Sequence, residues 1–130
     1  QPAQPAFFIC LGVVPYLRRD AISAVLQFIA SVPRSEVVFD YSEPLENYSL
    51  ERRANVAAVA ARTAAIGEPW LSYFDPSELS KNLHERGFQD LEDLGLADIA
   101  VRYLGAVKGP ATGDAGPHVI HARRLDGSLP

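Results

Sequence analysis

The first 41 residues constrain the fold most, because they place two short apolar runs on either side of an amphipathic segment. The first run, 6–11, contains Phe and Ile and is followed by Gly12 and Pro15, which favours a buried strand over a helix. Apolar residues recur at helical spacing through 19–32, and a proline follows. The second run, 36–41, predicts another buried strand. Strand, helix and strand in so short a stretch form a βαβ unit, which indicates a parallel sheet and an α/β fold class.

The rest of the chain predicts further helices and strands. Residues 45–66 are rich in alanine and lack glycine and proline, which predicts one long helix, closely packed or half exposed. Asp75 and Pro76 are typical of a helix start, and Gly87 is typical of its end. Three further elements are predicted, a short strand around 91–94, a short helix at 96–104 and a last strand at 118–125.

Length and composition indicate a single globular domain of 130 residues, with 48% apolar and 22% charged residues. The net charge of −4 disfavours binding to nucleic acid or to anionic membranes. The longest apolar run, 6–14, is shorter than the roughly 20 residues of a membrane span. It lacks a preceding basic stretch, so we expect no signal peptide and a cytoplasmic protein. Because the first residue is Gln, we expect a processed or excised piece, with a loop at 108–117 and a loose tail at 126–130.

Common catalytic motifs are absent from the sequence: it has no glycine-rich phosphate loop, no His-Glu-x-x-His and no Gly-x-Ser-x-Gly. His118 and His121 are three residues apart on a predicted strand, so they point to opposite faces and we expect no metal site. We expect these two histidines and His84 to be solvated at the surface. The single cysteine, Cys10, lies in an apolar run, which favours a buried, inert thiol.

The ends of the two predicted parallel strands are the candidate ligand site, because ligands of open α/β sheets bind at the carboxyl ends of strands. Gly12 would let a ligand approach the backbone closely, and Tyr16 and Tyr41 offer flat apolar faces with a polar tip. The alternative is that Gly12 only forms a turn and the tyrosines only pack. Trp70 clusters with two other aromatic residues, and such a cluster more often packs a core or a lid than binds a substrate.

An ordered set of segments, rather than any single motif, carries a resemblance that spans about residues 6–125. The set is similar to the S-adenosylmethionine-dependent O-methyltransferases related to leucine carboxyl methyltransferase. The matching segments are 11–17, 37–41, 67–70, 74–79, 83, 87–88, 92–95 and 102–104.

The resemblance implies a Rossmann-like methyltransferase sheet, of which this chain would hold the last four strands, the final one antiparallel. It implies a partial domain, because the family's glycine-rich cofactor loop and acidic ribose-binding residue would precede residue 1. Gly12 and Tyr16 match the family motif, whereas many members carry an acidic residue at the position of Leu11, near the cofactor. The implied roles are cofactor binding by Leu11 and Gly12 and acceptor binding by Tyr16, Tyr41 and Trp70, with no catalytic residue named.

The expected reaction is methyl transfer from S-adenosylmethionine to an oxygen of a small molecule or peptide, with a carboxylate as the candidate acceptor. Such a transfer is a direct displacement, so positioning and desolvation can supply most of the catalysis. The family fold pairs strand 6–11 on both sides, so we expect a homodimer or the missing N-terminal half to cover it. We expect the chain alone to bind S-adenosylmethionine weakly or not at all. The alternative function is a non-catalytic truncated half that acts as an oligomerising interaction module.

Overall fold

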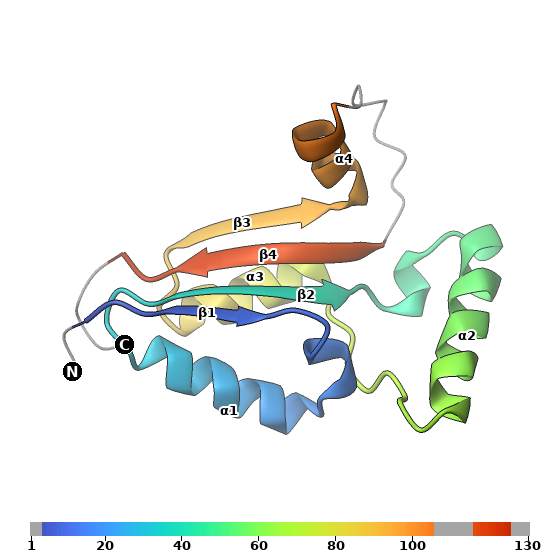
Figure 1. Ribbon diagram of the computed structural model, residues 1–130, viewed down its shortest axis with the longest axis horizontal. Coiled ribbons are helices and arrows are strands. Elements are labelled where there is room, and N and C mark those ends of the chain that lie inside the picture. Colours follow the sequence, from blue (N-terminus) through green and yellow to red (C-terminus); the bar gives the residue numbers. More distant parts are fainter. Residues whose placement is uncertain (1–3, 106–115, 126–130) are drawn as a thin grey trace.

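A four-stranded sheet flanked by helices makes up the computed structural model, which describes residues 4–105 and 116–125 (Figure 1). The strands are β1 (Phe7–Cys10), β2 (Glu36–Ser42), β3 (Asp90–Gly95) and β4 (Pro117–Arg123). The α-helices are α1 (Arg19–Ala30), α2 (Leu50–Ala65), α3 (Pro76–Glu85) and α4 (Leu96–Leu104). Two short 3-10 helices are η1 (Val14–Tyr16) and η2 (Leu45–Asn47).

The sheet has the strand order β1-β2-β4-β3. β1 pairs in parallel with β2, in a register that places Ile9 beside Val38. β4 lies between β2 and β3 and runs antiparallel to both. Because α1 connects β1 to β2, the predicted βαβ unit is confirmed, and so is the prediction that the last strand pairs antiparallel with its neighbours. The fold class is α/β, with a mixed open sheet.

Helices α1 and α3 cover one face of this sheet. Val37, Phe39 and Tyr41 alternate along β2, and each is 1% exposed. They share one core with Phe88, which lies between α3 and β3, and with side chains of both helices and of β4, namely Ile22, Leu26, Ile29, Leu79, Leu83, Ile120 and Ala122. Arg86, just after α3, donates from Nη2 to Ser23 Oγ of α1 at 2.7 Å, so the two helices lie side by side. This core fixes the orientation of the sheet ends.

The predicted start and end of α3 are confirmed. The Asp75 carboxylate accepts a hydrogen bond from the backbone N–H of Ser77 at 3.2 Å, and Pro76 is the first helical residue. Gly87 has a positive φ of 104°, and the following Phe88 N–H bonds back to Leu83 O at 3.1 Å. Such a left-handed residue ends a helix and lets the next apolar side chain fold back onto it.

The opposite face of the sheet is open beside β1. Phe7 and Ile9 lie on this face and are 53% and 64% exposed. Among the described residues no strand pairs with the outer edge of β1, and none of the described helices packs over these two side chains. Strands paired in parallel are normally covered on both faces and paired on both edges. In the described residues, β1 lacks a strand on its outer edge and a helix over this face.

The prediction of one helix over 45–66 is wrong at the beginning of that range. Residues 45–47 form η2, and Tyr48 is extended and buried. Ser49 caps the start of α2, because its side-chain oxygen accepts a hydrogen bond from the backbone N–H of Arg52 at 3.3 Å. Burial of Tyr48 takes the chain out of the helical conformation, which helix propensity alone does not reveal. No residue of α2 is buried, in agreement with the half-exposed alternative. Figure 1 shows α2 beyond the carboxyl end of β2, apart from the other helices.

Two predicted segments fall mainly outside the described residues: the loop at 108–117, of which Gly116 and Pro117 are described, and the tail at 126–130. Pro117 belongs to β4, so the last strand begins one residue earlier than predicted and ends at Arg123. Within the described part of the chain, none of the helices has the length and hydrophobicity that crossing a bilayer requires.

Candidate functional site

The strand directions bring several chain segments to one end of the sheet. Ser42, at the carboxyl end of β2, lies beside Pro117 at the start of β4, and Gly95 at the end of β3 lies beside His118. The turn after β1 is held at the same end, because the backbone N–H of Gly12 donates to Asp40 Oδ1 at 2.8 Å. This end is where open α/β sheets bind ligands.

A first groove, with a volume of about 670 Å³, lies beside the turn after β1. Its lining consists of Gly12, Tyr16, Gly67, Glu68, Pro69 and Leu71. Gly12 has a φ of +69°, and a Cβ placed on it would meet nothing within 4 Å. The turn therefore needs glycine for its backbone conformation, and its missing side chain leaves the backbone open to the groove.

A second groove, of about 520 Å³, lies between α2 and the sheet end. It is lined by Ser42, Tyr48, Arg52, Asn55, Val56, Val59, Trp70 and Pro117. The segment that carries Trp70 is fixed to η1, since Leu71 N–H donates to Pro15 O at 2.7 Å and Ser72 Oγ donates to Leu17 O at 2.5 Å. Leu71 lines the first groove and Trp70 the second, so this segment runs between them.

A polar cluster, which we call the His118 cluster, joins the ends of three strands through Tyr41, Glu43, Asp93 and His118. His118 Nδ1 is 2.8 Å from Asp93 Oδ1, and His118 Nε2 is 2.6 Å from Glu43 Oε2. The Tyr41 hydroxyl donates to Asp93, and its ring stacks on His118 with centroids 4.8 Å apart. Glu43 also accepts from Gly116 N–H at 3.2 Å and from Asn47 Nδ2 at 3.1 Å.

The charges of the cluster favour a protonated imidazole. Burial lowers the pKa of His118, but the hydrogen bonds to Asp93 and Glu43 and their negative charges outweigh it, so that the pKa lies above its ordinary value. Burial and the bond to Asp93 raise the pKa of Tyr41, so its hydroxyl stays a donor. With both ring nitrogens bonded to carboxylates, His118 holds strand ends together and has no lone pair for a ligand. In the described part of the chain no group of three or more His, Cys, Asp or Glu is arranged to hold a metal.

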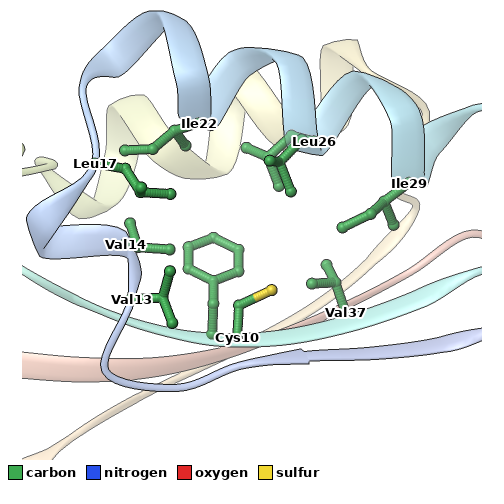
Figure 2. A pocket seen from close by; sticks show the side chains of 10 residues that line it. Cys10, Val13, Val14, Leu17, Ile22, Leu26, Ile29 and Val37 are labelled. Atoms are coloured by element: carbon green, nitrogen blue, oxygen red, sulfur yellow. The ribbon is translucent and has the colours of Figure 1, made fainter.

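An apolar pocket of about 80 Å³ lies between α1 and the sheet (Figure 2). Figure 2 shows Ile22, Leu26 and Ile29 of α1 facing Cys10 and Val37 of the sheet. Ligand pockets usually measure about 300–1,000 Å³ and contain polar groups that orient the ligand. This pocket is too small and lacks such groups, so we interpret it as a gap in the core. Cys10 is half-buried there.

In the structure, the predicted site residues do not lie in one site. Gly12 and Tyr16 line the first groove and Trp70 lines the second. Leu11 is 55% exposed and belongs to the lining of neither groove. Tyr41 is buried within the His118 cluster, and its ring also meets the rings of Phe39 and Phe74. Their roles toward a ligand stay predictions.

The prediction of solvated surface histidines is wrong for His118 and is confirmed only in part for His121, whose side chain is 32% exposed. His118 is 15% exposed between two carboxylates, and His121 Nε2 is 2.8 Å from Glu36 Oε1 on the opposite face. His84 is exposed, as predicted. The partners of His118 come from distant positions, and only the strand register places them together. A polar residue at each of three converging strand ends is the sequence signal that could have indicated the cluster.

No protein-family model matches the chain, and no curated protein does. Among solved structures, the chain is similar to the crystal structure of a "possible exported protein" from Bordetella parapertussis, with 14% sequence identity and a TM-score of 0.55. The similarity covers 91% of this chain and 38% of that chain. It supports the α/β fold. This chain therefore spans well under half the length of the protein it resembles in structure.

Proposed function

We propose that the chain is the C-terminal part of an S-adenosylmethionine-dependent methyltransferase that methylates an oxygen atom, with a carboxylate as acceptor. The observation that carries the proposal is the placement of β4, antiparallel between β2 and β3, beside a parallel β1–β2 pair. This is the arrangement that the sequence resemblance implies for the last four strands of a Rossmann-like methyltransferase sheet. Strand pairing and sequence segments thus support the same proposal by different routes.

The first groove fits one wall of a cofactor site. Gly12 exposes backbone to the groove without a side chain, Tyr16 offers a ring, and Glu68 adds a negative charge that suits a cationic sulfonium. When bound, S-adenosylmethionine supplies an activated methyl group. The residues of this chain would hold the cofactor on one side and the acceptor across the Trp70–Leu71 segment, and would keep water away from both. An ionised carboxylate acceptor needs no base to become a nucleophile.

The open edge of β1 supports the view that the site is completed by another polypeptide segment. A strand beside β1 and helices over Phe7 and Ile9 would cover exposed apolar surface. We propose that an N-terminal half with the glycine-rich loop takes this position. The similar solved structure also contains much additional chain beside the matched part.

Isothermal titration calorimetry tests the proposal by comparing the 130-residue chain with the polypeptide encoded by the whole reading frame. We expect micromolar binding of S-adenosylmethionine by the whole polypeptide and weak or no binding by the chain alone. The whole polypeptide should also form S-adenosylhomocysteine when carboxylates are supplied. Absence of both binding and product would contradict the proposal.

Gly12→Leu and Gly105→Leu form a matched pair of variants for this test. Both glycines have a φ of +69°, and a Cβ on either would meet nothing within 4 Å, so the backbone strain is similar. Gly12 lines the first groove and Gly105 does not. We expect the Gly12 variant of the whole polypeptide to lose affinity for S-adenosylmethionine and the Gly105 variant to retain it. Equal affinities would exclude Gly12 from the cofactor site.

The second candidate function is a non-catalytic interaction module, and the exposed edge of β1 is the observation that favours it. In this alternative a second copy of the chain, rather than an N-terminal half, pairs with β1 to form a homodimer. Light scattering on the 130-residue chain distinguishes the two. A stable dimer without any binding of S-adenosylmethionine by the whole polypeptide would favour the module.

A further inference from the structure

We propose that the first groove binds a methylated onium ion, which is a sulfonium or quaternary ammonium group, with Glu68 as its counter-ion and the ring of Tyr16 beside it. The lining comes from two segments, 12–16 and 67–71. In the proposed reaction, this site would favour the charged methyl donor over its neutral thioether product. That preference rests on the proposed function, whereas binding of an onium ion by the chain does not.

Two features make the groove attractive to a cation. Glu68 is the charged residue in its lining, and within residues 4–105 and 116–125 no group bonds to its carboxylate. Glu68 also follows the carboxyl end of α2 closely, where the last carbonyl groups of a helix carry partial negative charge. A carboxylate at that end is unfavourable without a cation, and Arg62 of the last turn does not line the groove.

Backbone hydrogen bonds fix the carboxylate and the ring relative to each other. The N–H of Glu68 donates to Thr63 O at 2.9 Å, which holds Glu68 against the end of α2. The N–H of Leu71 donates to Pro15 O at 2.7 Å, which ties the same segment to η1, where Tyr16 lies. Binding therefore needs little further ordering of the chain, and this lowers its entropic cost.

The hydrogen-bond acceptors of the groove distinguish between kinds of cation. A primary ammonium group has three N–H donors, and each needs an acceptor. The carbonyl groups of Pro15 and Thr63 already accept backbone N–H groups. A hard metal cation needs several oxygen ligands, and the lining offers a single carboxylate. A methylated onium ion has no N–H group, and its methyl groups suit the apolar surface of Pro69 and Leu71.

Tyr16 supplies an aromatic face to the same groove, and its side chain is 38% exposed. A cation over an aromatic ring at an exposed site gains about 2- to 5-fold in affinity. Aromatic rings are the usual partners of quaternary ammonium groups in proteins, because the π face attracts a cation that has no donor to offer.

Choline is the probe for the 130-residue chain, and 3,3-dimethylbutan-1-ol is its control. The alcohol has the same shape, with carbon in place of the cationic nitrogen. Binding is followed by the backbone N–H signals of Gly12 and Gly67, which line the groove, in nitrogen–proton correlation spectra. We expect choline to shift both signals and the alcohol to bind at least about 5-fold more weakly.

Two matched pairs of variants assign the contacts. Glu68→Gln should weaken choline binding by about 3-fold or more, whereas Glu85→Gln, an equal change of charge at an exposed position of α3, should leave it unchanged. Tyr16→Leu should weaken binding by about 2-fold or more, and Tyr16→Phe should retain it. Absence of shifts with choline, equal affinity for the alcohol, or unchanged affinity of Glu68→Gln would overturn the inference.

Calorimetry on the whole polypeptide tests the preference for the charged methyl donor. We expect S-adenosylmethionine to bind about 3-fold or more tightly than S-adenosylhomocysteine, and Glu68→Gln to remove this difference. Equal binding of both molecules by the natural polypeptide would overturn the inference and leave the proposed function standing. Binding of neither, with choline still bound through Glu68, would contradict the proposed function and leave the onium site standing.

Discussion

Replacing His118 by alanine should destabilise the protein by an amount that depends on pH. The change removes two hydrogen bonds to carboxylates, at 2.8 Å to Asp93 and 2.6 Å to Glu43, and leaves two negative charges together. Bonds of this charged type contribute about 1.5–3 kcal/mol each. The three side chains are 12–26% exposed, so water replaces part of what is lost. We expect the free energy of unfolding to fall by about 2–4 kcal/mol at pH 6.

The sign of the pH effect follows from the direction of the pKa shift of His118. Its pKa in the folded protein is raised above the value of about 6.5 in the unfolded chain. The stabilisation that protonated His118 provides is therefore complete at pH values below its pKa in the unfolded chain. It is lost as the pH rises through its pKa in the folded protein. The difference between the natural chain and His118→Ala should be larger at pH 6 than at pH 9.

Urea denaturation, followed by circular dichroism at both pH values, measures this difference. The control is His84→Ala, an exposed histidine on α3, which we expect to change stability by about 0.5 kcal/mol or less. An equal loss for His118→Ala at pH 6 and pH 9 would refute the argument that an imidazolium holds the cluster. A loss no larger than that of the control would refute the contribution of both bonds.

Three further outcomes are expected. Leu83→Ala, in the core, should cost about 2–5 kcal/mol in chemical denaturation, whereas Leu50→Ala, 80% exposed, should stay within about 0.5 kcal/mol. Ser49→Ala removes the side-chain cap of α2 and should cost that helix about 1 kcal/mol, visible as faster hydrogen exchange in its first turn; unchanged exchange would count against the cap. Ile9→Lys should abolish any self-association through β1 in sedimentation experiments, and Leu50→Lys should not; association that survives Ile9→Lys must use another surface.

Much of the fold could be predicted because local signals agreed with one another. The βαβ unit followed from two apolar runs and the helical spacing between them, and α3 followed from Asp75, Pro76 and Gly87. The beginning of α2 could not, because burial of Tyr48 is a tertiary event. Residues 45–49 contain no glycine and no proline, so helix propensity predicted one uninterrupted helix from residue 45 onward.

The candidate site was predicted in part, and for a physical reason. A glycine directly after a strand and aromatic residues near strand ends are visible in sequence, and Gly12, Tyr16 and Trp70 do line the two grooves. The His118 cluster depends on partners 25 and 75 residues away, which only the antiparallel register of β4 brings together. A histidine judged by its neighbours in the chain therefore looks solvated.

The position of β4 has a consequence for how the protein is made. β4 follows all the other strands in the chain, yet it lies between β2 and β3 in the sheet. As the chain leaves the ribosome, β1 and β2 can pair early, but β3 emerges before the strand that joins it to them. Contacts between residues so distant in sequence form slowly and leave apolar surface exposed in the meantime. A nascent chain that has not yet reached Arg123 therefore holds a β1–β2 pair and an unpaired β3, and its sheet is completed only after that point.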